Sequence, residues 1–167
     1  LSGGSSSTNK INKKLLEALI LSENLIDSVT IVFGKMGYIS ERIKKLMLNT
    51  SFNIKIVKHL DDITKEMREA SFAITSGGTT MWELMYIGVP FIAIPLNKKQ
   101  MDYLKLLKRD NICEVINDVD QIDIPKIKLC LESFIKNKTL QDQFRERAQF
   151  LLSSSKKENQ ILNKLNL

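Results

Sequence analysis

The sequence contains few of the residues from which disulfide-rich or zinc-stabilised domains are built: 2 cysteines and 1 histidine among 167 residues. Two cysteines cannot staple a small domain into a disulfide scaffold, and a single histidine beside them argues against a structural zinc site. We expect Cys113 and Cys130 to be small buried apolar side chains in a reducing compartment. The sequence predicts no metal site and no cofactor.

Glycine, proline and long apolar runs are also scarce. With 7 glycines, 3 prolines, 43% hydrophobic and 26% charged residues, the chain is neither collagen-like, disordered nor of low complexity. No apolar run approaches the roughly 18 residues that a membrane-spanning helix needs. The length suits one folded unit with a core of its own, and we expect it in the cytoplasm.

The formal net charge of +6 is unevenly distributed. Residues 123–167 carry nine basic and five acidic side chains, a net charge of +4, which leaves +2 for residues 1–122. Lysines mixed with acidic residues in a helical pattern indicate a solvated helix face. The alternative is a partner rich in phosphate, because a basic surface attracts polyanions such as nucleic acid or acidic lipid.

Short apolar runs alternate with longer amphipathic stretches. Continuous, β-branched runs of this kind predict buried strands, and apolar residues at helical spacing predict helices between them. We therefore expect an α/β fold: a Rossmann-like parallel sheet of about five to six strands with helices on both faces. The expected strands span residues 29–33, 53–57, 72–75, 91–94 and, more weakly, 112–115, and the expected helices span residues 12–21, 40–48, 61–70, 79–87 and 100–108.

From residue 123 onward the pattern predicts helices only, at residues 125–135, 140–152 and roughly 158–165. We expect residues 1–122 to form the α/β domain and residues 123–167 to form a helical appendage packed on it. Ser40 and Asp61 are typical helix N-caps, and Gly88 is placed to end the helix that closes at Ile87.

Two segments rich in glycine, serine and threonine stand where a parallel sheet binds ligands, beyond the carboxyl ends of its strands. One is residues 2–8; the other, called the glycine loop below, is residues 76–80, Ser-Gly-Gly-Thr-Thr. Glycine lets the backbone approach a ligand, and the N–H groups of the following helix point at an anion. Both segments together suit a diphosphate.

Each segment also has a simpler interpretation. Residues 2–8 have the composition of a linker, and the glycine loop is equally typical of a strand-to-helix turn with Thr79 as N-cap. Neither matches the P-loop or the dinucleotide fingerprint, and Lys35 stands where a ribose-binding acid is required, which disfavours NAD. Glu83 has two explanations. The helix dipole favours a carboxylate near the helix N-terminus, or the carboxylate accepts hydrogen bonds from the vicinal hydroxyls of a ribose.

Residues 70–100, ASFAITSGGTTMWELMYIGVPFIAIPLNKKQ, carry the most specific signal. They resemble the C-terminal, donor-binding domain of the two-domain GT-B nucleotide-sugar enzymes. Those enzymes include family 28 glycosyltransferases, the UDP-sugar hydrolases of pseudaminic acid synthesis and the related spore-coat polysaccharide proteins. The resemblance covers roughly residues 2–116. It is carried by the glycine loop, Trp82-Glu83-Leu84, Gly88-Val89-Pro90, Gln100, Gly3-Gly4-Ser5 and the segment VKHLDD at residues 57–62.

The resemblance implies a role for individual residues. His59 and the backbone of Leu60 would receive a uracil, and Glu83 would bind the ribose. Asn97 and Gln100 would contact the sugar. The diphosphate would be held by Gly3, Gly4, Ser5, Ser76, Gly77, Gly78, Thr79 and Thr80.

Two positions depart from the family patterns. Thr75 stands where the peptidoglycan transferase has an arginine before its glycine loop, so one phosphate contact is missing. Lys99 precedes Gln100 where the hydrolase branch often has asparagine. Transfer of the sugar and hydrolysis of the UDP-sugar therefore both remain open.

The resemblance also implies partners. It implies a UDP-sugar or UDP as ligand, no specific nucleic acid, and a place in cell-surface polysaccharide or nonulosonic acid biosynthesis. We expect the N-terminal GT-B domain, with the still unidentified catalytic residues, to be absent from this chain and the fragment alone to be inactive. A cytoplasmic protein is expected, and a position at the inner face of the membrane is left open. The rival hypotheses are a non-enzymatic basic module for nucleic acid or acidic lipid, and another Rossmann-like enzyme such as a methyltransferase.

Overall fold

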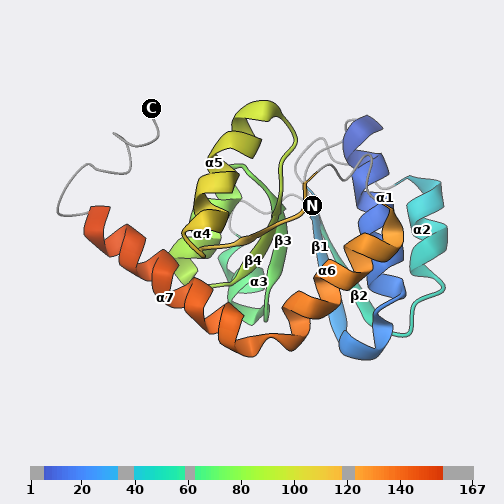
Figure 1. Ribbon diagram of the computed structural model, residues 1–167. Coiled ribbons are helices and arrows are strands. Elements are labelled where there is room, and N and C mark those ends of the chain that lie inside the picture. Colours follow the sequence, from blue (N-terminus) through green and yellow to red (C-terminus); the bar gives the residue numbers. More distant parts are fainter. Residues whose placement is uncertain (1–5, 34–39, 59–62, 118–122, 156–167) are drawn as a thin grey trace. The chain divides into compact units, whose positions relative to one another are not determined.

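The computed structural model describes residues 6–33, 40–58, 63–117 and 123–155 (Figure 1). The chain divides into two compact units, each built from two separate stretches of sequence. The first unit comprises Leu1–Ile63 and Ile116–Asn137, and the second comprises Thr64–Val115 and Lys138–Leu167. None of the helices in these described ranges is both long enough and apolar enough to cross a membrane.

The first unit holds a two-stranded parallel sheet. Strands β1 (Ser28–Phe33) and β2 (Asn53–Lys58) pair along their whole length, with Val29 opposite Ile54. Ile31, Phe33 and Val57 are buried, but Ile56 is 42% exposed, so the full burial that the continuous apolar runs predict is met only in part. The helical elements of this unit are α1 (Ser6–Ile20), the short 3-10 helix η1 (Glu23–Leu25), α2 (Glu41–Met47) and α6 (Ile124–Lys136).

Helix α1 packs against α6, and the two bury their apolar stripes. Leu15 of α1 and Ile127 and Leu131 of α6 are fully buried. Burial of a side chain of this size contributes about 1.5–3 kcal/mol each. Asp123 begins α6 by accepting a hydrogen bond from the N–H of Lys126 at 3.0 Å.

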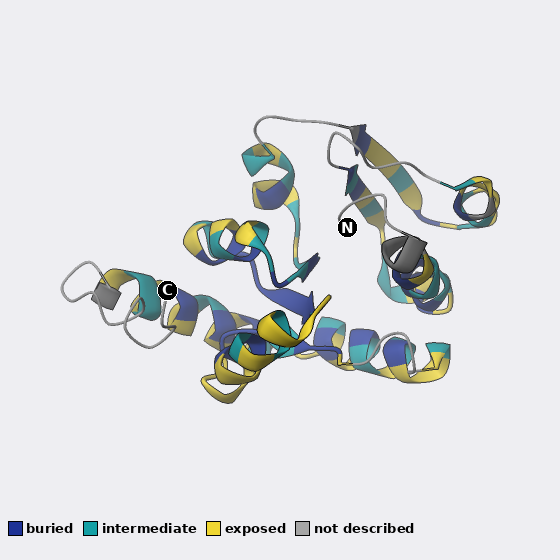
Figure 2. Ribbon diagram, turned by 90° about the horizontal axis from the view of Figure 1, so that it is seen from above, coloured by how far each residue is buried: buried dark blue, intermediate teal, exposed yellow. Residues whose placement is uncertain are grey.

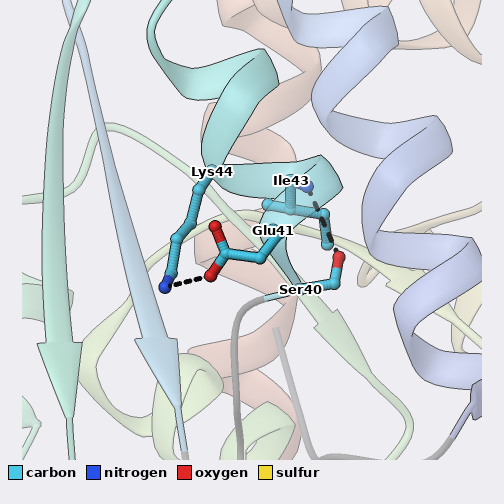
Figure 3. Close-up of polar contacts among 4 residues, drawn as sticks. All are labelled: Ser40, Glu41, Ile43 and Lys44. Atoms are coloured by element: carbon cyan, nitrogen blue, oxygen red, sulfur yellow. Dashed lines mark hydrogen bonds and ion pairs between the residues drawn. The ribbon is translucent and has the colours of Figure 1, made fainter.

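The predicted N-cap at Ser40 is confirmed. Its hydroxyl accepts a hydrogen bond from the backbone N–H of Ile43 at 3.4 Å, at the start of α2 (Figure 3). Glu41 and Lys44 form an ion pair at 2.6 Å on the exposed side of the same turn. Such exposed ion pairs stabilise a helix only slightly, so the Ser40 cap contributes more to the start of α2 than the ion pair does.

The second unit holds a three-stranded parallel sheet in the order β3-β4-β5. All four residues of the strand β4 are buried, whereas the helices of the unit have a buried and an exposed side (Figure 2). Helix α4 buries Met81, Leu84 and Met85 and contacts α3, α7 and both long strands. The elements are α3 (Thr64–Glu69), β3 (Ala73–Ser76), α4 (Thr79–Ile87), β4 (Phe91–Ile94), α5 (Lys98–Arg109), β5 (Glu114–Val115) and α7 (Lys138–Ser155).

Gly88 ends α4, as predicted. Its φ of +86° is a left-handed conformation, and its N–H donates to the carbonyl oxygen of Leu84 at 2.9 Å. The N–H of Val89 donates to the same carbonyl, so the helix closes and the chain turns into β4. Only glycine adopts this conformation without a penalty, which explains why it stands between the helix and the strand.

The α/β class and the parallel pairing are confirmed, with fewer strands in each sheet than the expected five to six. The described residues form five strands in two sheets, of two and three strands. The fifth strand is also shorter than expected and begins at Glu114. Asn111 has a left-handed φ of 51°, and its N–H donates to the carbonyl of Lys108, so the chain is still turning where an extended strand was expected.

The two expected tail helices are present as α6 and α7, and they belong to different units. The expected division of the chain between residues 122 and 123 stays a prediction. The expected last helix, at residues 158–165, and the expected cap at Asp61 lie outside the described residues.

Candidate functional site

Two loops of the second unit meet at one edge of its sheet. Strands β3 and β4 are parallel and in register, with Ser76 opposite Ile94, so both strands end at the same edge. The glycine loop follows β3 and leads into α4; residues 95–97 follow β4 and lead into α5. The sheet therefore brings the predicted diphosphate loop and the predicted sugar-contacting residues together.

Helix α4 begins without a side-chain cap. Its N-cap is Gly78, in an extended conformation, and no side chain bonds the first N–H groups of the helix. The interpretation of Thr79 as N-cap is wrong, because Thr79 is already the first helical residue. The hydroxyl of Ser76 lies 3.6 Å from the place that a Cβ on Gly78 would take, beside the start of the helix. Uncapped N–H groups next to a hydroxyl are suited to an anion.

Gly77 is buried against α5, and the contact leaves no room for a side chain. A Cβ at this position would lie 2.5 Å from the hydroxyl oxygen of Tyr103 and 3.1 Å from both Cβ of Gln100 and Cδ1 of Leu104. At Gly78, by contrast, the nearest atom is the Ser76 hydroxyl oxygen at 3.6 Å, an ordinary contact distance. Close packing against α5 therefore requires glycine at residue 77 and not at residue 78.

The side chains of Asn97 and Gln100 are joined through the start of α5. Oδ1 of Asn97 accepts a hydrogen bond from the N–H of Gln100 at 2.9 Å, and Oε1 of Gln100 accepts one from the N–H of Leu96 at 2.8 Å. The first bond caps the helix, while the second goes to the residue before the N-cap, where a capping box would bond the N-cap residue itself. The two bonds engage both side-chain oxygens, so the two amide nitrogens are the groups left to donate to a ligand.

The other predicted residues of this unit lie at or near the same loop. Thr79 is exposed, while Ser76 and Thr80 are half-buried. Glu83 is exposed and is the fifth residue of α4, so it does not lie in the first turn of the helix, where the dipole explanation would place it. Its binding of a ribose stays a prediction.

Burial controls the protonation of two groups near the loop. It raises the pKa of Cys113 to about 12, with a further rise from Glu114 that Lys108 partly offsets. Burial also raises the pKa of Tyr103, and the neighbouring Cys113 raises it further. Both groups therefore keep their protons at neutral pH. The expectation of two buried cysteines is correct for Cys113 and wrong for Cys130, which is half-buried.

Five predicted site residues cannot be compared with the structure. Gly3, Gly4, Ser5, His59 and Leu60 lie outside the described residues, although β2 ends directly before His59. Within the described part of the chain, no group of three or more histidine, cysteine, aspartate or glutamate side chains is placed to hold a metal ion.

Sequence reasoning missed Tyr103 and its contact with the glycine loop. Tyr103 follows Gln100 by three residues in α5, and side chains at that spacing lie on the same face of a helix. This spacing was a usable signal, because Gln100 had already been predicted to face the ligand.

Comparison with known proteins gives a consistent result. The sequence model of the glycosyltransferase family 28 C-terminal domain matches residues 1–162. A Methanocaldococcus jannaschii protein named uncharacterized protein MJ1062 is 30% identical over 116 residues, which are 66% of this chain and 24% of that protein. The UDP-N-acetylglucosamine–N-acetylmuramyl-(pentapeptide) pyrophosphoryl-undecaprenol N-acetylglucosamine transferase of Limosilactobacillus reuteri is 29% identical over 96 residues, 56% of this chain and 26% of the relative.

A solved structure supports the fold. The crystal structure of Acinetobacter baumannii MurG is similar with a TM-score of 0.69 and 20% identity, over 89% of this chain and 44% of that one. The chain thus spans about a quarter of the two relatives that it matches and less than half of the solved chain.

Proposed function

Because this chain belongs to the glycosyltransferase family 28 C-terminal domains, we propose that it binds a UDP-sugar or UDP at the carboxyl edge of β3 and β4. The observation that carries the proposal is the glycine loop itself. Gly77 is buried against α5 with no room for a side chain, and the loop runs from it through the half-buried Gly78 into the uncapped start of α4. Such a loop offers backbone N–H groups to a diphosphate without needing lysine or arginine.

The described residues have complementary chemistry around this loop. The hydroxyls of Ser76, Thr79 and Thr80 are donors for phosphate oxygens, and the carboxylate of Glu83 accepts hydrogen bonds from the ribose hydroxyls. The amide nitrogens of Asn97 and Gln100 remain to donate to the sugar. By the resemblance, Gly3, Gly4 and Ser5 add to the phosphate site, and His59 and Leu60 receive the uracil.

The proposed reaction breaks the bond between the sugar and the diphosphate. The departing UDP gains negative charge, and donors fixed on the diphosphate stabilise that charge more in the transition state than in the ground state. A general base must reach the attacking hydroxyl or water. We place that base in a further, N-terminal domain of the intact enzyme, and we propose that the present chain alone does not turn over.

Transfer to an acceptor is the favoured reaction, because the family is one of glycosyltransferases and the Limosilactobacillus relative is named as a transferase. Hydrolysis of the UDP-sugar is the second candidate, because residues 77–83, Gly-Gly-Thr-Thr-Met-Trp-Glu, resemble the hydrolase and spore-coat branch of these enzymes more closely. An acceptor carried by lipid would place the intact enzyme at the inner face of the membrane, in cell-surface polysaccharide or nonulosonic acid synthesis.

Calorimetric titration of the chain with UDP, UMP, GDP and CMP tests the ligand class. We expect UDP to bind more tightly than UMP and the uridine nucleotides more tightly than GDP or CMP. Binding to none of the four overturns the proposal. Binding to DNA or to anionic vesicles that falls steeply with salt and is unchanged in Glu83→Gln would instead support the basic-module hypothesis.

A further inference from the structure

Tyr103 reaches from α5 onto the backbone of the glycine loop. Its hydroxyl oxygen is the nearest atom to the place of a Cβ on Gly77, at 2.5 Å, and the Cβ of Gln100 lies 3.1 Å from the same place. Tyr103 and Gln100 therefore cover Gly77 side by side, as their spacing of three residues in α5 allows.

The phenol of Tyr103 carries a hydrogen-bond donor, its O–H group. Its hydroxyl oxygen lies against the backbone of Gly77, and within the described residues no fully buried side-chain oxygen or nitrogen lacks a partner. The Tyr103 side chain as a whole is half-buried, so it lies at the boundary between the packed loop and solvent. Buried tyrosines normally satisfy their hydroxyls, so a phenol that packs its ring and leaves its hydroxyl at a loop edge is placed for water or a ligand.

The protonation state suits an anionic ligand. Burial and the neighbouring Cys113 raise the pKa of Tyr103, so the phenol remains neutral and keeps its proton well above neutral pH. A neutral O–H donates to a phosphate oxygen without electrostatic repulsion, and a hydrogen bond to a charged acceptor is stronger than one between neutral groups.

We propose that the Tyr103 hydroxyl donates a hydrogen bond to the phosphate group of the bound nucleotide that lies nearer the sugar. This inference rests on the proposed binding of a UDP-sugar at the glycine loop. The phosphate nearer the sugar is chosen because Tyr103 stands beside Gln100, which is assigned to the sugar, and over Gly77, which is assigned to the diphosphate. Tyr103 thereby favours UDP over UMP, which lacks the second phosphate.

The test compares Tyr103→Phe with Tyr86→Phe, a matched change on α4 at a side chain that is 74% exposed. UDP and UMP are titrated into each variant and into the unchanged chain by calorimetry. We expect Tyr103→Phe to weaken UDP about tenfold and to leave UMP within about twofold, as loss of one charge-assisted hydrogen bond predicts. Tyr86→Phe should change neither.

Phosphorus NMR of the bound nucleotide gives a second readout that a mere packing role would not change. The β-phosphorus resonance of bound UDP should shift in Tyr103→Phe while the α-phosphorus resonance stays. Unchanged UDP affinity, or an equal loss for UDP and UMP, overturns the assignment of Tyr103 while the proposed function stands. If the unchanged chain binds neither nucleotide, the proposed function fails and this inference fails with it.

Discussion

The Asn97 side-chain oxygen accepts a hydrogen bond from the backbone N–H of Gln100 at 2.9 Å, at the start of α5. The Gln100 side-chain oxygen in turn accepts one from the backbone N–H of Leu96. The two residues predicted to contact a sugar are thus first of all a helix cap. Removing either amide changes the geometry of the loop as well as the proposed sugar contact, and mutagenesis must separate these two effects.

Replacement of Asn97 separates the two roles. Asn97→Ala removes the cap and should lower the free energy of unfolding by about 1 kcal/mol. Asn97→Asp keeps the accepting oxygen and should retain stability, yet it loses the amide donors and should bind the UDP-sugar more weakly. Urea unfolding and calorimetry measure the two effects. Equal stability of Asn97→Ala and the unchanged chain would contradict the cap.

A pair of adjacent glycines tests the packing of the glycine loop. Gly77→Ala places a Cβ 2.5 Å from the Tyr103 oxygen and 3.1 Å from Cβ of Gln100, so the Tyr103 side chain, the loop or α5 must shift. We expect a loss of about 1–3 kcal/mol in the free energy of unfolding, typical of overpacking, together with weaker UDP binding. Gly78→Ala has room for its methyl group and is the control; its stability should stay within about 0.5 kcal/mol. Similar losses in both variants would be inconsistent with the structure.

The left-handed residue after α4 gives a test that is independent of any ligand. Gly88 has a φ of +86°, and Gly88→Ala should cost about 1–2 kcal/mol of stability. Gly88→Asn should cost less, because asparagine tolerates this conformation better. Thermal unfolding of the two variants measures the difference, and an alanine variant as stable as the asparagine one argues against the turn.

The two cysteines should differ sharply towards iodoacetamide at pH 8. Cys113 is fully buried with a pKa of about 12, so only about one thiol in ten thousand is ionised, whereas Cys130 is half-buried. Mass spectrometry should find Cys130 labelled in the native chain and both cysteines labelled in urea. Rapid labelling of native Cys113 would show that its burial is wrong.

The Cys113 thiol makes the free energy of unfolding depend on pH in the alkaline range. Its pKa in the folded chain is about 12, raised from an ordinary value of 9.0, so the unfolded chain releases this proton first as the pH rises. The stabilising contribution is complete below pH 9 and is lost progressively between pH 9 and 12. Cys113→Ala should flatten this part of the pH profile of unfolding, and an identical slope in the variant would refute the assignment.

The proposed role of Glu83 in binding the ribose is tested by comparing two ligands. If its carboxylate accepts hydrogen bonds from the ribose, the chain should prefer UDP to 2′-deoxy-UDP by about tenfold, and Glu83→Gln should abolish most of that preference. Glu69→Gln, at the exposed end of α3, is the control. A preference that survives in Glu83→Gln removes Glu83 from the ribose site.

The sequence predicted those features that depend on local pattern. Strand β4 occupies the expected residues because its four apolar residues are continuous, and α4 matches because Gly88 marks its end. The cap of α2 at Ser40 follows from local hydrogen-bonding chemistry. The glycine loop lies between β3 and α4, as its residue types predict, and its role as a ligand site stays a prediction.

Features that depend on tertiary packing were not predicted. The contact between Gly77 and Tyr103 exists only once β3 and β4 lie in register and α5 packs over the loop. The shortening of β5 follows from the left-handed Asn111, a conformation that asparagine adopts in only a minority of its occurrences. The separation of the strands into two sheets is likewise absent from the apolar pattern, which is the same for one sheet or two.

The division of the chain into two interleaved units has a practical consequence for dissecting it genetically. The backbone passes from one unit to the other after residues 63, 115 and 137, so no single truncation point separates them. A fragment that stops at residue 122 loses α6 from the first unit and α7 from the second, and leaves α1 without the helix against which it packs. Ligand binding is therefore best mapped by point substitutions in the whole chain.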